Sequence, residues 1–235
     1  MANILVVDDD REIAGAIEIY LRNEGHEVLK AYDGFEALDM VRNNGIDLIL
    51  MDVMMPLLDG IQATKKIREE HNIPIIILSA KSEDYDKITG LNVGADDYIT
   101  KPFNPLELIA RVNSQLRRYT MLGSVTPSNN DHVYRTGGLV IDDKAKTVTL
   151  DGETIPVTPT EYGILKLLVE NAGQVFSIEQ IYEAVWKGEA YSAENTVAVH
   201  IRRIREKLEI DPKNPRYLKV VWGVGYKMEK IGGEQ

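Results

Sequence analysis

The first half of the chain alternates short apolar runs with stretches in which apolar residues recur every three or four positions. The short runs predict buried strands, and the three-to-four spacing predicts helices that bury one stripe. Strands separated by helices need crossover connections, so we expect an α/β fold with a doubly wound, five-stranded parallel sheet. The predicted strands are Asn3–Val7, Glu27–Ala31, Asp47–Met51, Pro74–Leu78 and Asp97–Thr100.

The pattern changes after Tyr119. Residues 120–132 are rich in Gly, Ser, Thr, Pro and Asn without periodicity, which predicts a linker between a domain at 1–119 and a second domain at 133–235. Thr158-Pro159-Thr160-Glu161 has the hydroxyl, proline and glutamate of a helix start. The second domain therefore reads as two short strands, three helices and a hairpin, a winged helix-turn-helix. Its predicted elements are Leu139–Asp142, Thr147–Leu150, a helix after Thr158, Ser177–Trp186, Ala193–Glu209 and Tyr217–Met228.

The amino-acid composition excludes several classes of protein. Hydrophobic residues make up 44% and charged residues 27%, as in globular proteins, and no apolar run is long and uncharged enough to span a bilayer. There are no cysteines, which excludes disulfides and cysteine zinc sites. The N-terminus lacks the basic flank of a secretory signal, so we expect a cytoplasmic protein without a membrane partner.

The net charge of −10 is unevenly distributed. Residues 1–120 carry 13 Lys/Arg against 21 Asp/Glu, whereas Glu194–Lys230 carries nine basic against five acidic residues. The acidic front and the basic end therefore indicate different tasks.

Acidic residues follow two of the predicted strands. Asp8 and Asp9 come directly after the first strand, and Asp52 after the third. The carboxyl ends of parallel strands meet at one edge of the sheet, so these carboxylates can converge. Such a cluster repels itself unless a hard cation lies among its oxygens, and Mg²⁺ suits it. The alternative is that the acidic run at Asp8–Asp10 only caps the following helix.

Two further strand ends add a hydroxyl, Ser79, and an ammonium, Lys101. Together with a carboxylate and a cation they describe a phosphoryl site. Asp52 would attack phosphorus, Mg²⁺ and Lys101 would neutralise the phosphoryl oxygens, and Ser79 would donate a hydrogen bond to the product.

With these residues, 1–119 resembles the receiver domain of two-component response regulators, which has a flavodoxin/CheY-like fold. The matching segments are Val6–Asp9, Leu50–Pro56, Leu78–Ala80 and Gly94–Phe103. The resemblance implies that Asp52 accepts phosphate from a sensor histidine kinase. It also implies that Asp9, Asp52 and the Met54 carbonyl ligate Mg²⁺ directly, with Asp8 acting through water. A cis Lys101–Pro102 bond is implied as well.

The same resemblance implies a switch pair and a dimer face. Ser79 and Tyr98 would move together when Asp52 is phosphorylated. A charged face would then pair two receivers as a homodimer, because weak exposed pairs form it only when phosphorylation shifts the equilibrium. The expected pairs are Lys87 with Glu107, Asp97 with Arg111 and Asp96 with Arg118.

Ala193–Glu209 predicts a basic helix. Val197, Ile201, Ile204 and Leu208 are spaced to bury one stripe, which leaves polar and basic side chains on the remaining surface. A helix of this kind can lie in a major groove of DNA, although a basic face is also often only solvated. The expected contact residues on the helix are Asn195, Thr196, Val199, His200, Arg202, Arg203 and Arg205.

Residues 133–230 resemble the winged-helix output domain of the OmpR/PhoB subfamily, through Val157–Tyr162, Val197–Leu208 and Val221–Lys227. The resemblance implies promoter DNA with tandem half-sites, a wing carrying Lys227 in the neighbouring minor groove, and RNA polymerase contact near Lys144 and residues 187–194. Some relatives have Arg where this chain has Trp222, so we expect Trp222 to pack rather than to read bases. Lys81–Asp84, Thr64–Ile73, Asp33-Gly34 and Trp222–Lys227 further resemble VanR-type regulators.

Two alternatives stay open. An aspartyl nucleophile with Mg²⁺ and lysine is also the equipment of a haloacid-dehalogenase-type phosphatase, but those enzymes carry a second aspartate two residues after the nucleophile, where this chain has Met54. The other alternative is a DNA-binding protein whose first domain dimerises without phosphate. The stimulus and the target genes are not encoded in these patterns.

Overall fold

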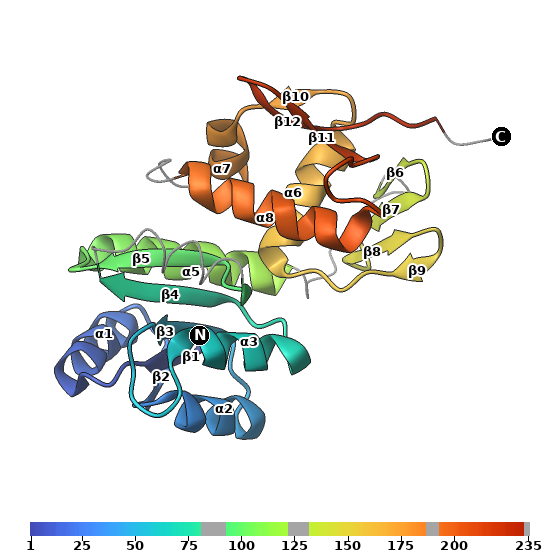
Figure 1. Cartoon of the computed structure of the whole chain (residues 1–235). Coiled ribbons are helices and arrows are strands. Elements are labelled where there is room, and N and C mark those ends of the chain that lie inside the picture. The colour runs from blue at the N-terminus through green and yellow to red at the C-terminus, as the bar shows by residue number, and fades with distance from the viewer. Residues whose placement is uncertain (81–92, 122–131, 187–192, 233–235) are drawn as a thin grey trace. The chain divides into compact units, whose positions relative to one another are not determined.

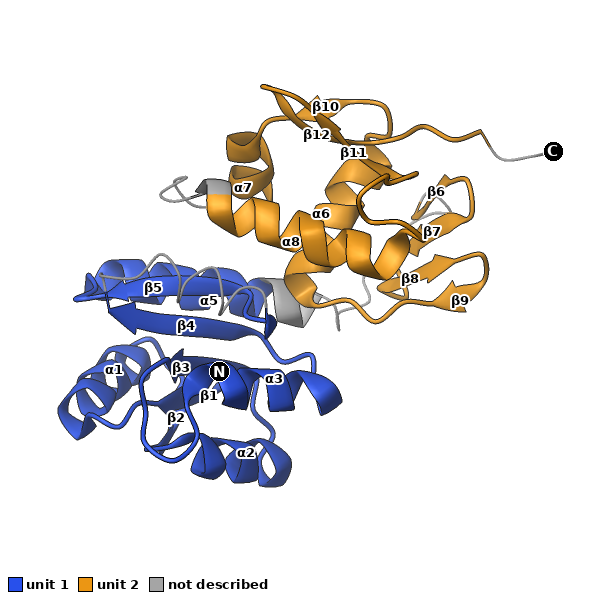
Figure 2. Ribbon diagram, viewed as in Figure 1, with its two compact units in different colours: residues 1–119 blue, residues 120–235 orange. Residues whose placement is uncertain are grey.

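The computed structural model describes residues 1–80, 93–121, 132–186 and 193–232, and excepts the side chains of 118–121 and 193–194. The chain divides into two compact units, Met1–Tyr119 and Thr120–Gln235 (Figure 2). Most of the predicted linker, residues 122–131, lies outside the described residues. Each unit has its own hydrophobic core.

The first unit is built on a five-stranded sheet in which every neighbouring pair is parallel. The strand order is β2–β1–β3–β4–β5, so the direction of winding reverses between β1 and β3. The predicted α/β fold is confirmed, and each strand ends within two residues of its predicted bounds. The strands are β1 (Asn3–Val7), β2 (Glu27–Ala31), β3 (Leu48–Asp52), β4 (Ile75–Ala80) and β5 (Asp97–Lys101).

Helices cover both faces of this sheet (Figure 1). The apolar stripes of α1 (Arg11–Asn23) and α5 (Pro105–Met121) bury every second strand residue on one face, Ile4, Val6 and Leu50 among them. The alternate strand residues are equally buried; Met51, for example, lies against the start of α3. The remaining helices are α2 (Gly34–Asn43) and α3 (Gly60–Glu70). Because both faces are covered, the strands are apolar throughout until the carboxyl edge is reached.

Three aspartates cap the helices that begin at this carboxyl edge. The Asp10 carboxylate accepts hydrogen bonds from the amides of Glu12 and Ile13 at 2.8 and 3.3 Å. Asp33 and Asp59 cap α2 and α3 in the same way. Capping satisfies amides that have no partner within the helix. The capping alternative is therefore correct for Asp10, which leaves Asp8 and Asp9 available for another task.

The second unit opens with a four-stranded antiparallel sheet, followed by three helices and a three-stranded sheet of order β10–β12–β11. The predicted strands, helices and hairpin are confirmed; β6, β9 and β10 are additional. The bounds are β6 (Val133–Thr136), β7 (Leu139–Asp142), β8 (Thr147–Leu150), β9 (Glu153–Thr154), α6 (Pro159–Glu170), β10 (Val175–Phe176), α7 (Ile178–Trp186), α8 (Ala193–Leu208), β11 (Leu218–Val221) and β12 (Gly225–Met228).

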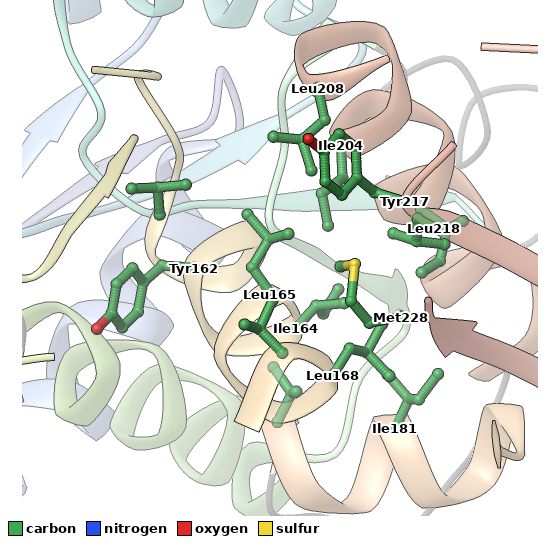
Figure 3. Packing of buried hydrophobic residues seen from close by; sticks show 14 of the residues in the cluster. Tyr162, Ile164, Leu165, Leu168, Ile181, Ile204, Leu208, Tyr217, Leu218 and Met228 are labelled. Carbon is green, nitrogen blue, oxygen red and sulfur yellow. The ribbon is translucent and has the colours of Figure 1, made fainter. Parts of the chain in front are cut away.

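One hydrophobic cluster holds this unit together. Leu165 and Leu168 of α6 lie between Ile181 of α7 and the Leu218–Met228 side of the hairpin, as Figure 3 shows. At the start of α6 the predicted capping box is present: the Thr158 hydroxyl accepts from the Glu161 amide, and the Glu161 carboxylate accepts from the Thr158 amide at 2.9 Å. The core therefore fixes α8 and the hairpin in one rigid body.

Candidate functional site

The predicted carboxylate cluster forms at the edge of the first unit where the winding reverses. Val7 of β1 pairs with Met51 of β3, so Asp8 and Asp52 follow side by side. Asp8 and Asp52 are buried and Asp9 is exposed. One ligand oxygen from each of the three lies within 4.8 Å of the others. Neighbouring parallel strands thus deliver three acids to one small volume.

Lys101 closes this cluster from the end of β5. Its Nζ donates to Asp8 Oδ2 at 2.7 Å and to Asp52 Oδ1 at 2.6 Å. The predicted cis bond between Lys101 and Pro102 is present. The lysine that sequence spacing selected therefore bridges the two buried acids, which are 93 and 49 positions away along the chain.

The ammonium and the carboxylates set each other's proton affinity. Burial raises the pKa of Asp52, and the nearby charge of Asp8 adds to that effect, while Lys101 opposes it. Burial alone would lower the pKa of Lys101, but its contacts with Asp52 and Asp8 outweigh burial and raise that pKa. Lys101 is therefore held as a cation beside a carboxylate that is poorly solvated.

The second oxygen of Asp52 accepts from the Met54 amide at 3.0 Å. The loop that supplies this amide is shaped by Gly60, where a Cβ would lie 1.8 Å from the Asp52 carbonyl oxygen. Such an overlap with backbone leaves room for no other residue at this position. Asp52 is thus fixed from one side by a turn and from the other by Lys101.

The predicted switch residues lie on the neighbouring strands. Asp52 pairs with Leu78, so Ser79 follows at the same edge; it is buried, and its hydroxyl donates to the Ala80 carbonyl at 3.1 Å. Tyr98 on β5 is also buried and pairs with Ile77. In this conformation, therefore, the Ser79 hydroxyl is engaged by backbone next to Asp52.

The donors at this edge fit Mg²⁺. Three carboxylates offer hard oxygen atoms. Because Asp9 is exposed to solvent, an ion bound here could keep the water ligands that Mg²⁺ usually retains. Among the residues that the structure describes, this is also the one group of acids with metal-ligand spacing. Asp10 does not belong to the set, because its carboxylate is committed to the start of α1.

The predicted dimer face is only partly at the surface. Arg111 donates to both oxygens of Asp97 at 3.0 Å and pairs with Glu107 within the same chain. Asp97 is itself buried, and Asp96 is fully buried and pairs with Arg68 at 2.7 Å, so the expected place of both on an exposed face is wrong for this conformation. The Asp96 carboxylate also accepts from the Ile75 amide, which makes it part of the fold. Lys87 and the Arg118 side chain lie outside the described residues.

Helix α8 buries more of its surface than the sequence analysis expected. Beyond the Val197–Leu208 stripe, Thr196, His200 and Arg203 are buried as well. The ring centroids of His200 and Trp186 are 5.5 Å apart, and the Arg203 guanidinium pairs with the Glu161 carboxylate of α6 at 2.9 Å. These three were wrongly expected on the DNA-facing surface, because α8 packs against both α6 and α7 rather than one neighbour.

The exposed face of α8 is a narrower stripe. Asn195 and Arg202 are exposed, whereas Val199, between them at helical spacing, is buried, so its expected place on the DNA-facing surface is also wrong. Arg205 is half-buried and donates its Nε to the Leu218 carbonyl at 3.0 Å, which ties α8 to the hairpin. Lys227 is on β12 and pairs with Glu229 at 3.2 Å. Of the predicted contacts, therefore, Asn195 and Arg202 on α8 and the hairpin cation Lys227 remain geometrically available.

Trp222 is at the turn of the hairpin and is 88% exposed. The expectation that it packs is wrong, because β11 ends before it, β12 begins only at Gly225, and the three-residue turn between them holds it away from the core. Sequence reasoning also missed Glu161 as an ion-pair partner. Its capping-box position was the available signal, but the spacing gave no sign of Arg203 and Lys207 beside it.

Two family models match the chain. Residues 4–113 match the response regulator receiver domain, and residues 152–228 match the C-terminal domain of transcriptional regulatory proteins. The regulatory protein VanR of Enterococcus faecium is 48% identical over 97% of this chain and 98% of its own length. This chain belongs to the response regulators. Its receiver is joined to a DNA-binding domain of the OmpR/PhoB type, and it is a transcription factor.

Two further matches support the same family. VanRc of Enterococcus gallinarum is 47% identical over 97% of the chain and 98% of that protein. The second is the structure of DrrB, described as an OmpR/PhoB homologue from Thermotoga maritima. It is 35% identical in sequence, and the match covers 97% of this chain and 99% of DrrB with a TM-score of 0.51. Within the described part of this response regulator, none of the helices is long and apolar enough to cross a membrane.

Proposed function

We propose that this response regulator is phosphorylated on Asp52 by a sensor histidine kinase and then binds promoter DNA as a dimer. The observation that carries the proposal is the Lys101 ammonium held between the buried Asp8 and Asp52 carboxylates at 2.7 and 2.6 Å. A cation in that position neutralises charge that develops on a transferring phosphoryl group.

In the proposed transfer, a carboxylate oxygen of Asp52 attacks the phosphorus of the kinase's phosphohistidine. The P–N bond breaks, its electron pair returns to the imidazole nitrogen, and the product is an aspartyl phosphate. Asp9, Asp52 and the Met54 carbonyl would hold Mg²⁺, with Asp8 acting through water, and the ion would supply charge neutralisation at the phosphoryl oxygens. Lys101 keeps Asp52 oriented before attack and faces the phosphoryl group after it.

The signal would leave the site through Ser79. Its hydroxyl would exchange the Ala80 carbonyl for a phosphoryl oxygen, and the Tyr98 ring would follow into the space that Ser79 vacates. Because Tyr98 lies one residue from Asp97, this movement would alter the Asp97–Arg111–Glu107 network. We propose that these groups, with Lys87 and Arg118, then pair across a receiver dimer.

In the output unit, the exposed Asn195 and Arg202 would enter the major groove of each half-site. Two receivers joined as a dimer would favour two tandem half-sites about one helical turn apart. RNA polymerase would be contacted near Lys144 and residues 187–194. The kinase and the genomic DNA are both cytoplasmic partners, so we place this response regulator in the cytoplasm.

The same site would also accept phosphate from a small donor such as acetyl phosphate and hydrolyse it slowly, because its residues position and neutralise rather than recognise the donor. A phosphatase of the haloacid-dehalogenase type is disfavoured. The position two residues after Asp52 is Met54, an exposed thioether that cannot transfer a proton.

The test is selection of binding sites from a random duplex library in Mg²⁺, with and without beryllium trifluoride as the phosphoryl mimic. We expect two direct half-sites to be enriched mainly in the treated sample, and no such gain for Asp52→Asn. Equal enrichment with and without the mimic would favour a receiver that dimerises without phosphate. No enrichment in either sample would contradict DNA reading by α8.

A further inference from the structure

The wing of this response regulator carries two exposed apolar side chains. Trp222 is 88% exposed and Val224 is 55% exposed, both in the turn between β11 and β12. A large apolar group that a fold leaves in water has a cost, and tryptophan is enriched where proteins make contacts. Trp222 is therefore available to contact a partner outside its own domain.

The backbone of this turn is held in place by hydrogen bonding and by glycine. The Val224 amide donates to the Val221 carbonyl at 3.0 Å, and Gly223 adopts a φ of +74° at the third position of that turn. A positive φ at this position is a glycine conformation. At the base of the turn, a Cβ on Gly225 would lie 2.0 Å from the Phe176 carbonyl oxygen, so β12 lies directly against β10. The indole is thus presented by a preformed hairpin, which lowers the entropic cost of binding.

The charges at the base of the hairpin indicate what this partner is. Lys219 and Lys227 are directly opposite each other on β11 and β12. Like charges in this register repel. The Lys219 ammonium donates to the Pro215 carbonyl, and Lys227 pairs with the partly exposed Glu229. A polyanion along the hairpin would relieve this repulsion.

A duplex minor groove has the complementary pattern. Its rims are phosphates and its interior walls are apolar deoxyribose, within a width of about 6 Å. Apolar wedges are a known means of occupying it. The hairpin is also continuous with α8, because Arg205 joins the helix to Leu218 at 3.0 Å. A duplex on the exposed stripe of α8 therefore has the hairpin within the same rigid body.

We propose that Trp222 packs against deoxyribose in the minor groove and supplies a part of the DNA affinity that does not depend on salt. The proposal rests on the proposed DNA-binding function and adds to it the chemistry of the wing. An arginine at this position would instead be drawn to the high negative potential of narrow, A-tract grooves. With Trp222 in place of a cation, this wing has no such attraction to narrow minor grooves.

The chain carries its own probe for this contact. It has two tryptophans, of which Trp186 is buried at 3% exposure and Trp222 is at the wing. In the full-length protein treated with beryllium trifluoride, the emission of Trp222 should be quenched by acrylamide, and the selected duplex should protect it. Trp222→Phe leaves only Trp186 and provides the reference spectrum. A Trp222 emission that acrylamide quenches equally with and without duplex would overturn the proposal.

Affinity measured over a range of salt concentrations gives an independent test. We expect Trp222→Ala to weaken binding about tenfold, within the range of aromatic contacts to nucleic acid, with an unchanged slope of log affinity against log salt. Trp222→Arg should steepen that slope by about 0.9, the value for one additional phosphate contact, and should favour A-tract flanks. The matched control is Ile210→Ala, which removes another exposed apolar side chain of the same unit and should leave affinity unchanged.

The outcomes separate this proposal from the proposed function. Wild-type protein that binds no duplex would overturn DNA reading itself, and the role of Trp222 with it. Wild-type protein that binds, with Trp222→Ala equal to it in affinity, would overturn only the role of Trp222. Protection of Trp222 in the dimer before DNA is added would assign the indole to a second copy of the chain and would also overturn the proposal.

Discussion

Residue spacing predicted both the acidic residues at the edge of the receiver sheet and the DNA-facing residues of helix α8. The first prediction agrees with the structure, whereas the second agrees only in part. Asp8, Asp52 and Lys101 converge as expected. On α8, by contrast, Thr196, His200 and Arg203 are turned into the domain. Parallel strands deliver their ends to one edge whatever lies around them. A helix presents a face that depends on how many neighbours cover it, and α8 has at least two, α6 and α7.

The two arginines at adjacent positions of α8 give the sharpest test of this difference. Arg203 pairs with the buried Glu161, whereas Arg202 pairs with the exposed Glu206. Arg203→Met should destabilise the second unit by about 1.5–3 kcal/mol, because the buried Glu161 carboxylate loses its guanidinium and keeps only the Lys207 ammonium. Arg202→Met should change stability by less than about 0.5 kcal/mol. Unfolding followed through the buried Trp186 measures both.

For DNA affinity, we expect the opposite order: Arg202→Met should have the larger effect and Arg203→Met the smaller. Arg202→Met should lower affinity and reduce the salt slope by about 0.9 if its guanidinium meets a phosphate. Arg203→Met, assayed at a temperature where it is folded, should retain the wild-type slope. An Arg203→Met protein as stable as the wild type, with a reduced slope, would return Arg203 to the DNA-facing surface.

A smaller effect is expected from acid. Burial raises the pKa of Glu161, but Arg203 and Lys207 outweigh burial and hold that pKa below its ordinary value of 4.5. A lowered folded-state pKa stabilises the second unit fully above pH 4.5, and this contribution is lost as pH falls through the folded-state value. Denaturation curves from pH 7 downward should therefore show a steeper loss below pH 4.5 in the wild type than in Glu161→Gln.

Asp143 also has a lowered pKa, through its contacts with Lys146, Lys166 and Tyr162, although burial opposes the shift. Its contribution is present in both proteins and cancels in the comparison. If the free energy of unfolding fell with pH in parallel for the wild type and Glu161→Gln, the ion pairs that Glu161 of α6 makes with Arg203 and Lys207 of α8 would not contribute to stability.

The receiver's charged network offers a test at the level of assembly. Asp97→Asn keeps the size of the side chain but removes the charge that Arg111 meets at 3.0 Å. We expect phosphorylation at Asp52 to be unchanged and the affinity of the phosphorylated dimer to fall about tenfold or more. Sedimentation with beryllium trifluoride measures the dimer. Glu70→Gln, which removes an acid from the exposed Arg42 pair, is the control and should behave as wild type.

The smallest effect should come from the start of α6. Thr158→Ala removes the hydroxyl that accepts from the Glu161 amide, at a cost of about 1 kcal/mol. The second unit should unfold at slightly lower denaturant with the same cooperativity, while Asp52 phosphorylation is unaffected. A loss as large as that of Arg203→Met would mean that the cap, rather than the ion pair, positions Glu161.

Much of this molecule could be predicted from its sequence because the decisive signals are local or topological. Alternating apolar segments predicted the five parallel strands, and right-handed crossovers account for helices on both faces once the winding reverses. The capping box at Thr158 and Glu161 was predicted from four consecutive residues. Lys101 was predicted to join Asp8 and Asp52 because all three follow strands.

The remainder depends on contacts that no local pattern encodes. Arg68 reaches Asp96 across 28 positions, which turns an expected surface charge into a buried support for the start of β5. Lys207 reaches Glu161 across 46 positions. The exposure of Trp222 was missed for the same reason, since an apolar residue is normally expected to pack, and only the turn geometry keeps it in solvent.

The central claim is that a phosphoryl group on Asp52 drives DNA binding, and one titration tests it most directly. The affinity of the full-length protein for the selected tandem duplex is measured in Mg²⁺ with and without beryllium trifluoride, for the wild type, for Asp52→Asn and for the exposed-acid control Asp39→Asn. The account predicts that the mimic increases affinity at least about tenfold, as allosteric coupling of 1–3 kcal/mol allows, for the wild type and Asp39→Asn but not for Asp52→Asn. An equal increase in Asp52→Asn, or no increase in the wild type, would contradict it.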